Sequence, residues 1–246
     1  HASVLLQLVG IIILTDPVFS RRASPLPFLG PQRKTPPVLS VEQLHQLDAV
    51  VISHSHYDHL DDATIRKILK RFPDVCCFVP LGLADWFRRR GAKRVVELDW
   101  WQSFTWQGMT LTAVPAQHWS MRTPWNRNRS LWCGWVMEGR HHRFWFSGDT
   151  GYSPELLLIP ERLGQIDAAA LPIGAYAPRW FMAVHHMDPQ SAVALWQQLG
   201  CPLAFPIHWG VFELADEALD EPVQELTDVL DNLAPVNHSF RILKIG

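Results

Sequence analysis

Short apolar runs and amphipathic stretches follow each other along most of the chain. Residues 50–52 form a continuous apolar run, which is typical of a buried strand. After it, Ile65 and Ile68 lie on one face of a helix that begins at Asp61 or Asp62, since aspartate is a frequent N-cap. This mixture predicts sheets covered by helices. The same patterns predict further strands at residues 75–79, 95–98, 109–114, 131–137, 143–146, 203–207 and 240–245, and further helices at residues 84–90, 189–199 and 216–233.

The length of 246 residues fits one large domain, and we expect a single hydrolase domain over residues 1–246. The proline-rich segment 24–37 is predicted to be a surface loop, because apolar runs continue on both sides of it. The apolar stretch 4–14 is too short to span a bilayer. The chain begins with His1 rather than methionine, so we expect that upstream residues are missing and that targeting stays open.

Composition narrows the class of protein. Hydrophobic residues make up 48% and charged residues 19%, which is typical of a globular chain. The 22 basic and 24 acidic residues nearly balance, so a nucleic-acid partner is not expected. The four cysteines form no CxxC pair and are predicted to be small buried residues, which favours a reducing, cytoplasmic location with membrane association left open. The sequence does not indicate the oligomeric state.

The densest group of histidines follows the predicted strand at residues 50–52. Strand alternation would point His54 and His56 the same way, so that they can share one ion. Asp58 and His59 would then turn toward a second position. Imidazole and carboxylate together suit zinc, with iron or manganese as alternatives. The other interpretation is a surface loop that is rich in histidine by chance.

Three more predicted strands end in residues of the same kind. His118 ends the run 114–118 after the predicted strand at 109–114, Asp149 follows the aromatic strand at 143–146, and His208 follows the run at 203–207. A single histidine at a strand end is more often a packing residue. Together with the first motif, however, these positions supply five histidines and two aspartates, which is the ligand count for two metal ions.

Motifs spread over nearly the whole chain match one known family. Besides the histidine motif they include Glu-Leu-Asp-Trp-Trp at 97–101, Phe-Ser-Gly-Asp-Thr-Gly-Tyr at 146–152, Pro-Arg-Trp-Phe-Met at 178–182 and Ile-His-Trp-Gly at 207–210. On these residues the chain resembles the metallo-β-lactamase superfamily, and within it the N-acyl-phosphatidylethanolamine-hydrolysing phospholipase D branch. The resemblance implies an α+β fold of the αββα type, in which two mixed β-sheets pack face to face with helices outside.

The resemblance also implies roles for individual residues. The ligands of two zinc ions would be His54, His56 and His118 for one ion and Asp58, His59 and His208 for the other. Asp149 would bridge the two ions, and Tyr57 and His186 would contact the lipid phosphate. His1 matches a histidine of the family's Gly-His-Ala-Ser/Thr motif. Asp16 would either orient ligands or only shape the turn before Pro17.

The chain departs from the family pattern at three positions. Ser55 stands in place of asparagine, which should matter little. His185 replaces a glutamine beside the phosphate contact, which puts the head-group preference in doubt. Met121 stands where a lysine is expected, which puts any response to bile acids in doubt. Tryptophan-rich segments around residues 119 and 180 would form a groove for acyl chains or would belong to the core.

These features predict a dinuclear zinc phosphodiesterase. The expected substrate is N-acyl-phosphatidylethanolamine or a similar phospholipid, cleaved to N-acylethanolamine and phosphatidic acid, with Asp149 and His186 taking part in catalysis. Peripheral contact with a membrane would be needed for such a substrate. One alternative is a hydrolase of a small soluble phosphodiester or a sugar-phosphate lactone. Another, from a different class, is a metal-binding protein without catalysis, which the complete ligand set disfavours.

Overall fold

Two mixed β-sheets form the centre of the computed structural model, which describes residues 1–200, 203–233 and 239–245. The five-stranded sheet has the order β1 (Leu5–Leu8), β2 (Ile11–Thr15), β3 (Ala49–Val51), β4 (Cys76–Pro80), β5 (Arg94–Leu98). The six-stranded sheet has the order β11 (Leu203–Ile207), β10 (Ala168–Pro172), β9 (Arg143–Phe146), β8 (Gly134–Glu138), β7 (Met109–Val114), β6 (Ser103–Trp106). Strands β2 to β5 and β9 to β11 run parallel, and the other pairs are antiparallel.

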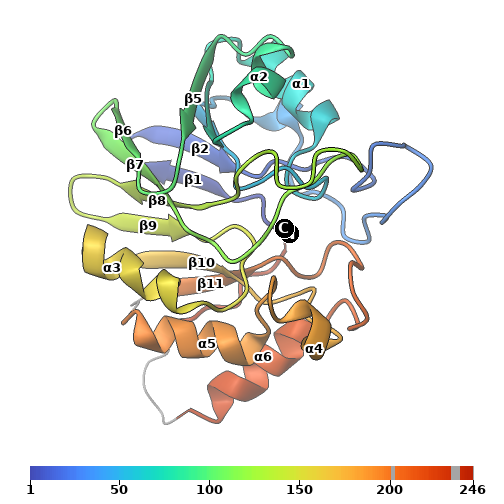
Figure 1. The fold of residues 1–246 in the computed structure, drawn as a ribbon, viewed down its shortest axis with the longest axis vertical. Helices are drawn as coiled ribbons and strands as arrows, with labels where there is room; N and C mark the ends of the chain where they lie inside the picture. Colours follow the sequence, from blue (N-terminus) through green and yellow to red (C-terminus); the bar gives the residue numbers. More distant parts are fainter. Residues whose placement is uncertain (201–202, 234–238, 246) are drawn as a thin grey trace.

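Helices cover the outer faces of both sheets (Figure 1). They are α1 (Asp62–Arg71), α2 (Ala84–Arg88), α3 (Leu158–Leu163), α4 (Arg179–Met182), α5 (Pro189–Gln198) and α6 (Glu221–Asp231), with the 3-10 turns η1 (Val41–Gln43) and η2 (Pro154–Leu157). Side chains of α1 and α2 pack on the five-stranded sheet, and those of α3, α5 and α6 on the six-stranded sheet. This is the predicted arrangement of two mixed sheets with helices outside.

The two sheets share one buried layer of large side chains. Val51 and Phe78 of the first sheet pack with Leu111, Trp135 and Met137 of the second, and all five are fully buried or nearly so. Their burial removes apolar surface from water, which is the main force that holds two sheets face to face. Because both sheets contribute to this layer, the strand ends of one sheet lie close to those of the other.

Local signals explain the elements that the sequence predicted. The side chain of Asp61 accepts a hydrogen bond from the Ala63 amide and caps α1, whose Ile65 and Ile68 are buried. Likewise, Asp188 accepts from the Ser191 amide and caps α5. The cysteines at positions 76, 77 and 133 are free and buried, as predicted, whereas Cys201 lies outside the described residues. Among the described residues, no helix has the length and apolar character needed to cross a membrane.

Two predicted elements begin later than expected. The strand at 131–137 begins only at Gly134, because the residues before it hydrogen-bond to segments that leave the other sheet. For example, the Cys133 amide donates to the carbonyl of Ser53, just after β3. The helix at 216–233 begins only at Glu221, because the carboxylate of Glu217 accepts from the amides of Ala175 and Ala177 and holds this segment in a loop.

The predicted strand at 240–245 is wrong. Only Phe240 pairs with β11, through one bridge to Ala204. The amide of Ala204 donates to Ser239, and the amide of Arg241 donates to Ala204. The next donor on β11 in a parallel ladder would be residue 206, which is a proline without an N–H. The ladder therefore stops after one pair.

Candidate metal centre

The carboxyl ends of five strands meet where the two sheets face each other. Asp16 follows β2, the segment 53–59 follows β3, and His118, Asp149 and His208 follow β7, β9 and β11. The side chains from these strand ends form the clusters described below. His56 and Asp58 are partly exposed, and the others are buried. The structure thus brings all seven sequence-predicted ligand residues to one place.

Three histidines form the first cluster. The Nε2 atom of His54 lies 2.9 Å from Nδ1 of His56, and the Nε2 atom of His118 lies 3.2 Å from the same Nδ1. These three nitrogens therefore face one point, and they form one of the groups whose spacing would hold a metal ion. The predicted grouping of these histidines agrees with this geometry.

Asp58 is the centre of the second cluster. Its Oδ2 atom lies 3.3 Å from Nε2 of His59 and 3.3 Å from Nε2 of His208. A third imidazole, that of His1, has its Nε2 atom 3.1 Å from the same oxygen. Sequence reasoning assigned no role to His1, and the match to the family motif was the one signal that could have indicated it.

Asp149 lies between the two clusters. Its Oδ2 atom is 3.0 Å from Nε2 of His59 and 2.9 Å from Nε2 of His208, and it is also 3.9 Å from Nε2 of His118 in the first cluster. A carboxylate in this position can reach both clusters. Gly148 permits it, because its φ is +62° and a Cβ there would lie 2.5 Å from the Cβ of Ser53.

Asp16 orients ligands in both clusters. Its buried carboxylate lies 2.7 Å from Nδ1 of His59 and accepts from the amide and hydroxyl of Ser53. The hydroxyl oxygen of Ser53 in turn lies 2.9 Å from Nδ1 of His54. Each Nδ1 thus has an acceptor for its proton, which leaves the Nε2 lone pair free for a metal. Of the two roles considered for Asp16, the orienting one fits these contacts.

Burial and charge set the protonation of the clusters in the metal-free protein. Burial lowers the pKa of His54 and His118 well below the usual range and that of His56 to about 4, so the first cluster is neutral at pH 7. In the second cluster burial would lower the pKa of His208, but the charge of Asp149 outweighs it and raises that pKa to about 9. A metal that binds there would displace this proton.

The donor set fits a metal on independent grounds. Buried polar atoms that face the clusters have no hydrogen-bond partner among the described residues, including Nε2 of His59 and Oδ1 of Asp149. Buried polar atoms are rarely left unpaired in a folded protein, so a ligand at this point would satisfy them. Imidazole nitrogens with carboxylate oxygens are donors that suit zinc, iron or manganese.

A cleft of about 370 Å³ opens directly onto the clusters. Its lining includes His56, Asp58, Asp149 and the two residues predicted to contact phosphate, Tyr57 and His186. The Nδ1 atom of His186 lies 4.0 Å from Oδ2 of Asp149 and has no hydrogen-bond partner among the described residues. The hydroxyl of Tyr57 donates to the carbonyl of Arg122 at 2.8 Å, so it would have to turn to reach a phosphate.

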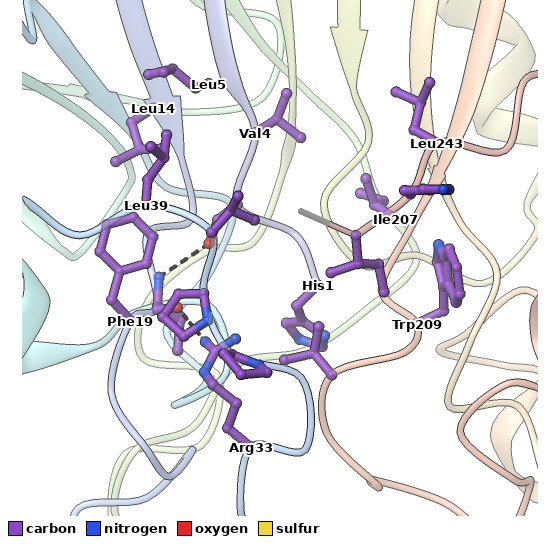
Figure 2. Close-up of a pocket in the computed structure, with 18 of the residues that line it drawn as sticks. His1, Val4, Leu5, Leu14, Phe19, Arg33, Leu39, Ile207, Trp209 and Leu243 are labelled. Atoms are coloured by element: carbon purple, nitrogen blue, oxygen red, sulfur yellow. Dashed lines mark hydrogen bonds between the residues drawn. The ribbon is translucent and has the colours of Figure 1, made fainter. Parts of the chain in front are cut away.

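A second cavity, of about 300 Å³, lies behind His1. Figure 2 shows it between the apolar side chains of Val4, Phe19, Ile207 and Trp209. His1 lines this cavity and also contacts Asp58, so its imidazole separates the cavity from the second cluster. The metal-binding groups other than His1 are absent from its lining.

Comparison with known proteins agrees with the fold and the clusters. The family model of the beta-lactamase superfamily domain matches residues 12–209. The chain belongs to the beta-lactamase superfamily. This membership confirms the predicted fold and the prediction of a metal-dependent hydrolase.

Two solved structures show the same superfamily fold over 100% of this chain. A metallo hydrolase from Ignicoccus hospitalis has a TM-score of 0.73, 21% identity and 93% of its own chain covered. An isothiocyanate hydrolase from Delia radicum gut bacteria has a TM-score of 0.76 and 18% identity, and the match covers 94% of its own chain.

The predicted branch of the superfamily is confirmed as well. The chain is 42% identical to N-acyl-phosphatidylethanolamine-hydrolyzing phospholipase D 1 of Caenorhabditis elegans over 94% of its own length and 68% of that protein. It is 33% identical to the mitochondrial N-acyl-phosphatidylethanolamine-hydrolyzing phospholipase D of Saccharomyces cerevisiae, over 88% of its own length. It spans only 47% of the yeast protein.

We expect the purified protein to bind two metal ions per chain, because two ligand clusters share the carboxylate of Asp149. Affinity at the second cluster should rise with pH up to about pH 9, because below that pH the metal must displace the proton of His208. Elemental analysis and metal titration at several pH values test both statements. One bound ion, with no second ion taken up on titration, would contradict the first.

Proposed function

We propose that residues 1–246 form a dinuclear zinc phosphodiesterase of the phospholipase D type. Its substrate would be N-acyl-phosphatidylethanolamine or a similar lipid, which water cleaves at a phosphate ester bond to N-acylethanolamine and phosphatidic acid. The observation that carries this proposal is the cleft, whose lining combines residues of the ligand clusters with apolar side chains such as Trp119, Met121 and Met182. The two related phospholipases D support the same substrate class.

Large apolar side chains are exposed in the protein, and several of them lie close in sequence to residues that line the cleft. Trp125 is 83% exposed and follows Pro124 in the lining, whereas Trp180 is 84% exposed and lies on α4 two residues before the lining residue Met182. Phe181 and Phe28 are also exposed. Water-exposed aromatic residues at several neighbouring loops are typical of a surface that meets a partner or a lipid interface. We infer peripheral contact with a membrane through this surface.

The aromatic residues divide between this surface and the core. Trp135 is fully buried between the sheets, and Trp100, Trp101 and Trp132 are partly buried. Trp119 instead lines the cleft beside His56, with their ring centroids 4.4 Å apart. The core interpretation therefore holds for the buried tryptophans, and we propose that the acyl-chain groove is built from those at residues 119, 125 and 180.

The geometry of the clusters supports the proposed ligand roles. His54, His56 and His118 would hold one ion, Asp58, His59 and His208 the other, and Asp149 both. Bound there, the ions would lower the pKa of a water molecule and neutralise charge on the phosphoryl oxygens.

The chain's own residues do the rest. Asp149 would orient the attacking water and accept its proton, because its Oδ1 atom is buried and unpaired among the described residues. His186 would donate a hydrogen bond to a phosphoryl oxygen, since its ring lines the cleft with a free nitrogen near Asp149.

The protein should prefer an acylated, membrane-borne phosphodiester to a soluble one. Burial of each methylene contributes about 0.8 kcal/mol, so four methylenes in the groove would raise binding roughly two hundredfold. The test compares kcat/KM for N-acyl-phosphatidylethanolamine in micelles with that for its deacylated glycerol analogue. Equal or faster cleavage of the soluble analogue would exclude the lipid and favour a small phosphodiester or a sugar-phosphate lactone.

His186→Ala should leave both ions in place and reduce turnover by about 10²-fold or more, the scale for losing one transition-state donor. His186 lies outside the proposed ligand set, but its side chain faces Asp149 across the cleft. The matched control is His185→Ala, which keeps the carbonyl that accepts from His118 and should retain both ions and most of the turnover. Equal kcat/KM in His186→Ala and the parent would show that His186 has only a structural role.

A further inference from the structure

His1 occupies a defined position beside the second cluster. Its side chain is only 3% exposed, and its ring centroid lies 4.3 Å from that of His208 and 5.3 Å from that of Phe212, which it meets edge to face. Its carbonyl oxygen accepts a hydrogen bond of 3.1 Å from the amide of His208. The side chain and the backbone of one residue therefore both contact the cluster.

The contacts of His1 differ from those of the proposed ligands. The Nε2 atoms of His59 and His208 face both Asp58 and Asp149, which places them around a common point. Nε2 of His1 reaches Oδ2 of Asp58 at 3.1 Å, and no ion pair of His1 with Asp149 is found among the described residues. His1 thus approaches Asp58 from the side of the apolar cavity shown in Figure 2.

The backbone contact holds His208 in an unusual conformation. His208 has a φ of +62°, in the left-handed region that side chains other than glycine rarely adopt. A Cβ at residue 174 would lie 2.2 Å from the carbonyl oxygen of His208, so only the glycine found there leaves room for this backbone. The hydrogen bond to the carbonyl of His1 is what satisfies the His208 amide in this conformation.

We propose that His1 is a positioning residue of the second metal site. Its Nε2–H donates to Asp58 and fixes the carboxylate, while its carbonyl fixes the backbone of His208. Residues that hydrogen-bond metal ligands without binding the metal themselves typically support metal affinity or activity. Their removal lowers either by about 10- to 100-fold. The inference rests on the metal centre proposed above and adds to it a residue that acts through the ligands.

Three variants of the full chain separate the roles open to His1. His1→Gln places an amide N–H near the position of Nε2 and keeps the donor, whereas His1→Ala removes it. His1→Phe keeps an aromatic ring against His208 and Phe212 without any donor. Each variant is titrated with Zn²⁺ and with Co²⁺, whose absorption spectrum reports the ligand set of the bound ion. Turnover is measured afterwards on a generic phosphodiester.

His1→Ala and His1→Phe are expected to lose about 10- to 100-fold in affinity for one of the two ions. Their kcat should fall while KM stays unchanged, because Asp58 would hold metal rather than substrate. His1→Gln should keep the parent's affinity and Co²⁺ spectrum. If His1→Ala does not fold, the comparison of His1→Phe with His1→Gln decides.

Two results would overturn the proposal. Parent-like affinity in both His1→Ala and His1→Phe would show that the side chain of His1 does not position Asp58. A His1→Gln variant as weak as His1→Phe, with an altered Co²⁺ spectrum, would make His1 a ligand instead. A parent protein that binds no ion at Asp58 would overturn the metal centre as well. Failure to cleave lipids leaves the inference intact, because the titration uses no lipid.

Discussion

Replacing Asp149 with asparagine is expected to abolish nearly all hydrolytic activity, by about 10³-fold or more, while the protein stays folded. The carboxylate reaches His59 and His208 on one side and His118 on the other, so both clusters share it. An amide has nearly the same shape, but it carries no charge and offers only one acceptor oxygen. It can neither serve two cations nor accept a proton from water.

The measurement for Asp149→Asn combines kcat on a generic phosphodiester, metal content and thermal unfolding. Asp167→Asn is a suitable control, because Asp167 also accepts a backbone hydrogen bond near a strand end, from the Arg143 amide, but contacts neither cluster. The control should keep parent-like turnover. Near-normal turnover of Asp149→Asn with two bound ions would contradict the bridging role.

Asp16→Asn is expected to have the second largest effect, a loss of about 10² to 10⁴-fold in activity, although Asp16 would touch no metal. With its oxygen still facing the Ser53 amide, the new amide nitrogen would point at Nδ1 of His59. His59 would then have to carry its proton on Nε2, the atom that faces Asp58 and Asp149. A protonated Nε2 cannot bind a metal.

Metal titration and turnover of Asp16→Asn test this argument. The matched control is Asp48→Asn, because Asp48 also accepts a backbone hydrogen bond on the same sheet, from the Ile12 amide, but faces no histidine of the clusters. An amide oxygen can replace that acceptor, so the control should behave like the parent. Parent-like zinc affinity in Asp16→Asn would show that His59 keeps its tautomer without the carboxylate.

The sequence predicted best those elements whose signals are local. Strands β7 and β9 match their predicted ranges, because apolar residues in alternation or in a short run mark them, and α1 and α5 begin at the predicted aspartate caps. Strand β10 was not predicted, since three of its five residues are alanine, which has little preference for strands. Strands β1 and β2 were recognised only as an apolar stretch, and their antiparallel pairing depends on the turn at Val9 and Gly10.

The candidate site, like the fold, could be predicted where local patterns indicate it. Metal-binding residue types at strand ends indicated seven residues, and the structure brings these together. The contacts of Asp16 and His1 were beyond local patterns, because they join residues 43 and 57 positions apart. A hydrogen bond over such a separation depends on how the sheets pack, which no short motif records.

The origin of the ligands has a consequence for the integrity of the fold. In each cluster, two residues that follow β3 of the five-stranded sheet meet a histidine that follows a strand of the six-stranded sheet, His118 in one case and His208 in the other. Each bound ion would therefore be a cross-link between the two halves of the sandwich. At a free metal concentration a thousand times the dissociation constant, one such cross-link contributes about 4 kcal/mol to the free energy of unfolding. In a metal-starved cell the metal-free protein would therefore unfold more readily. Proteases would then degrade this inactive form.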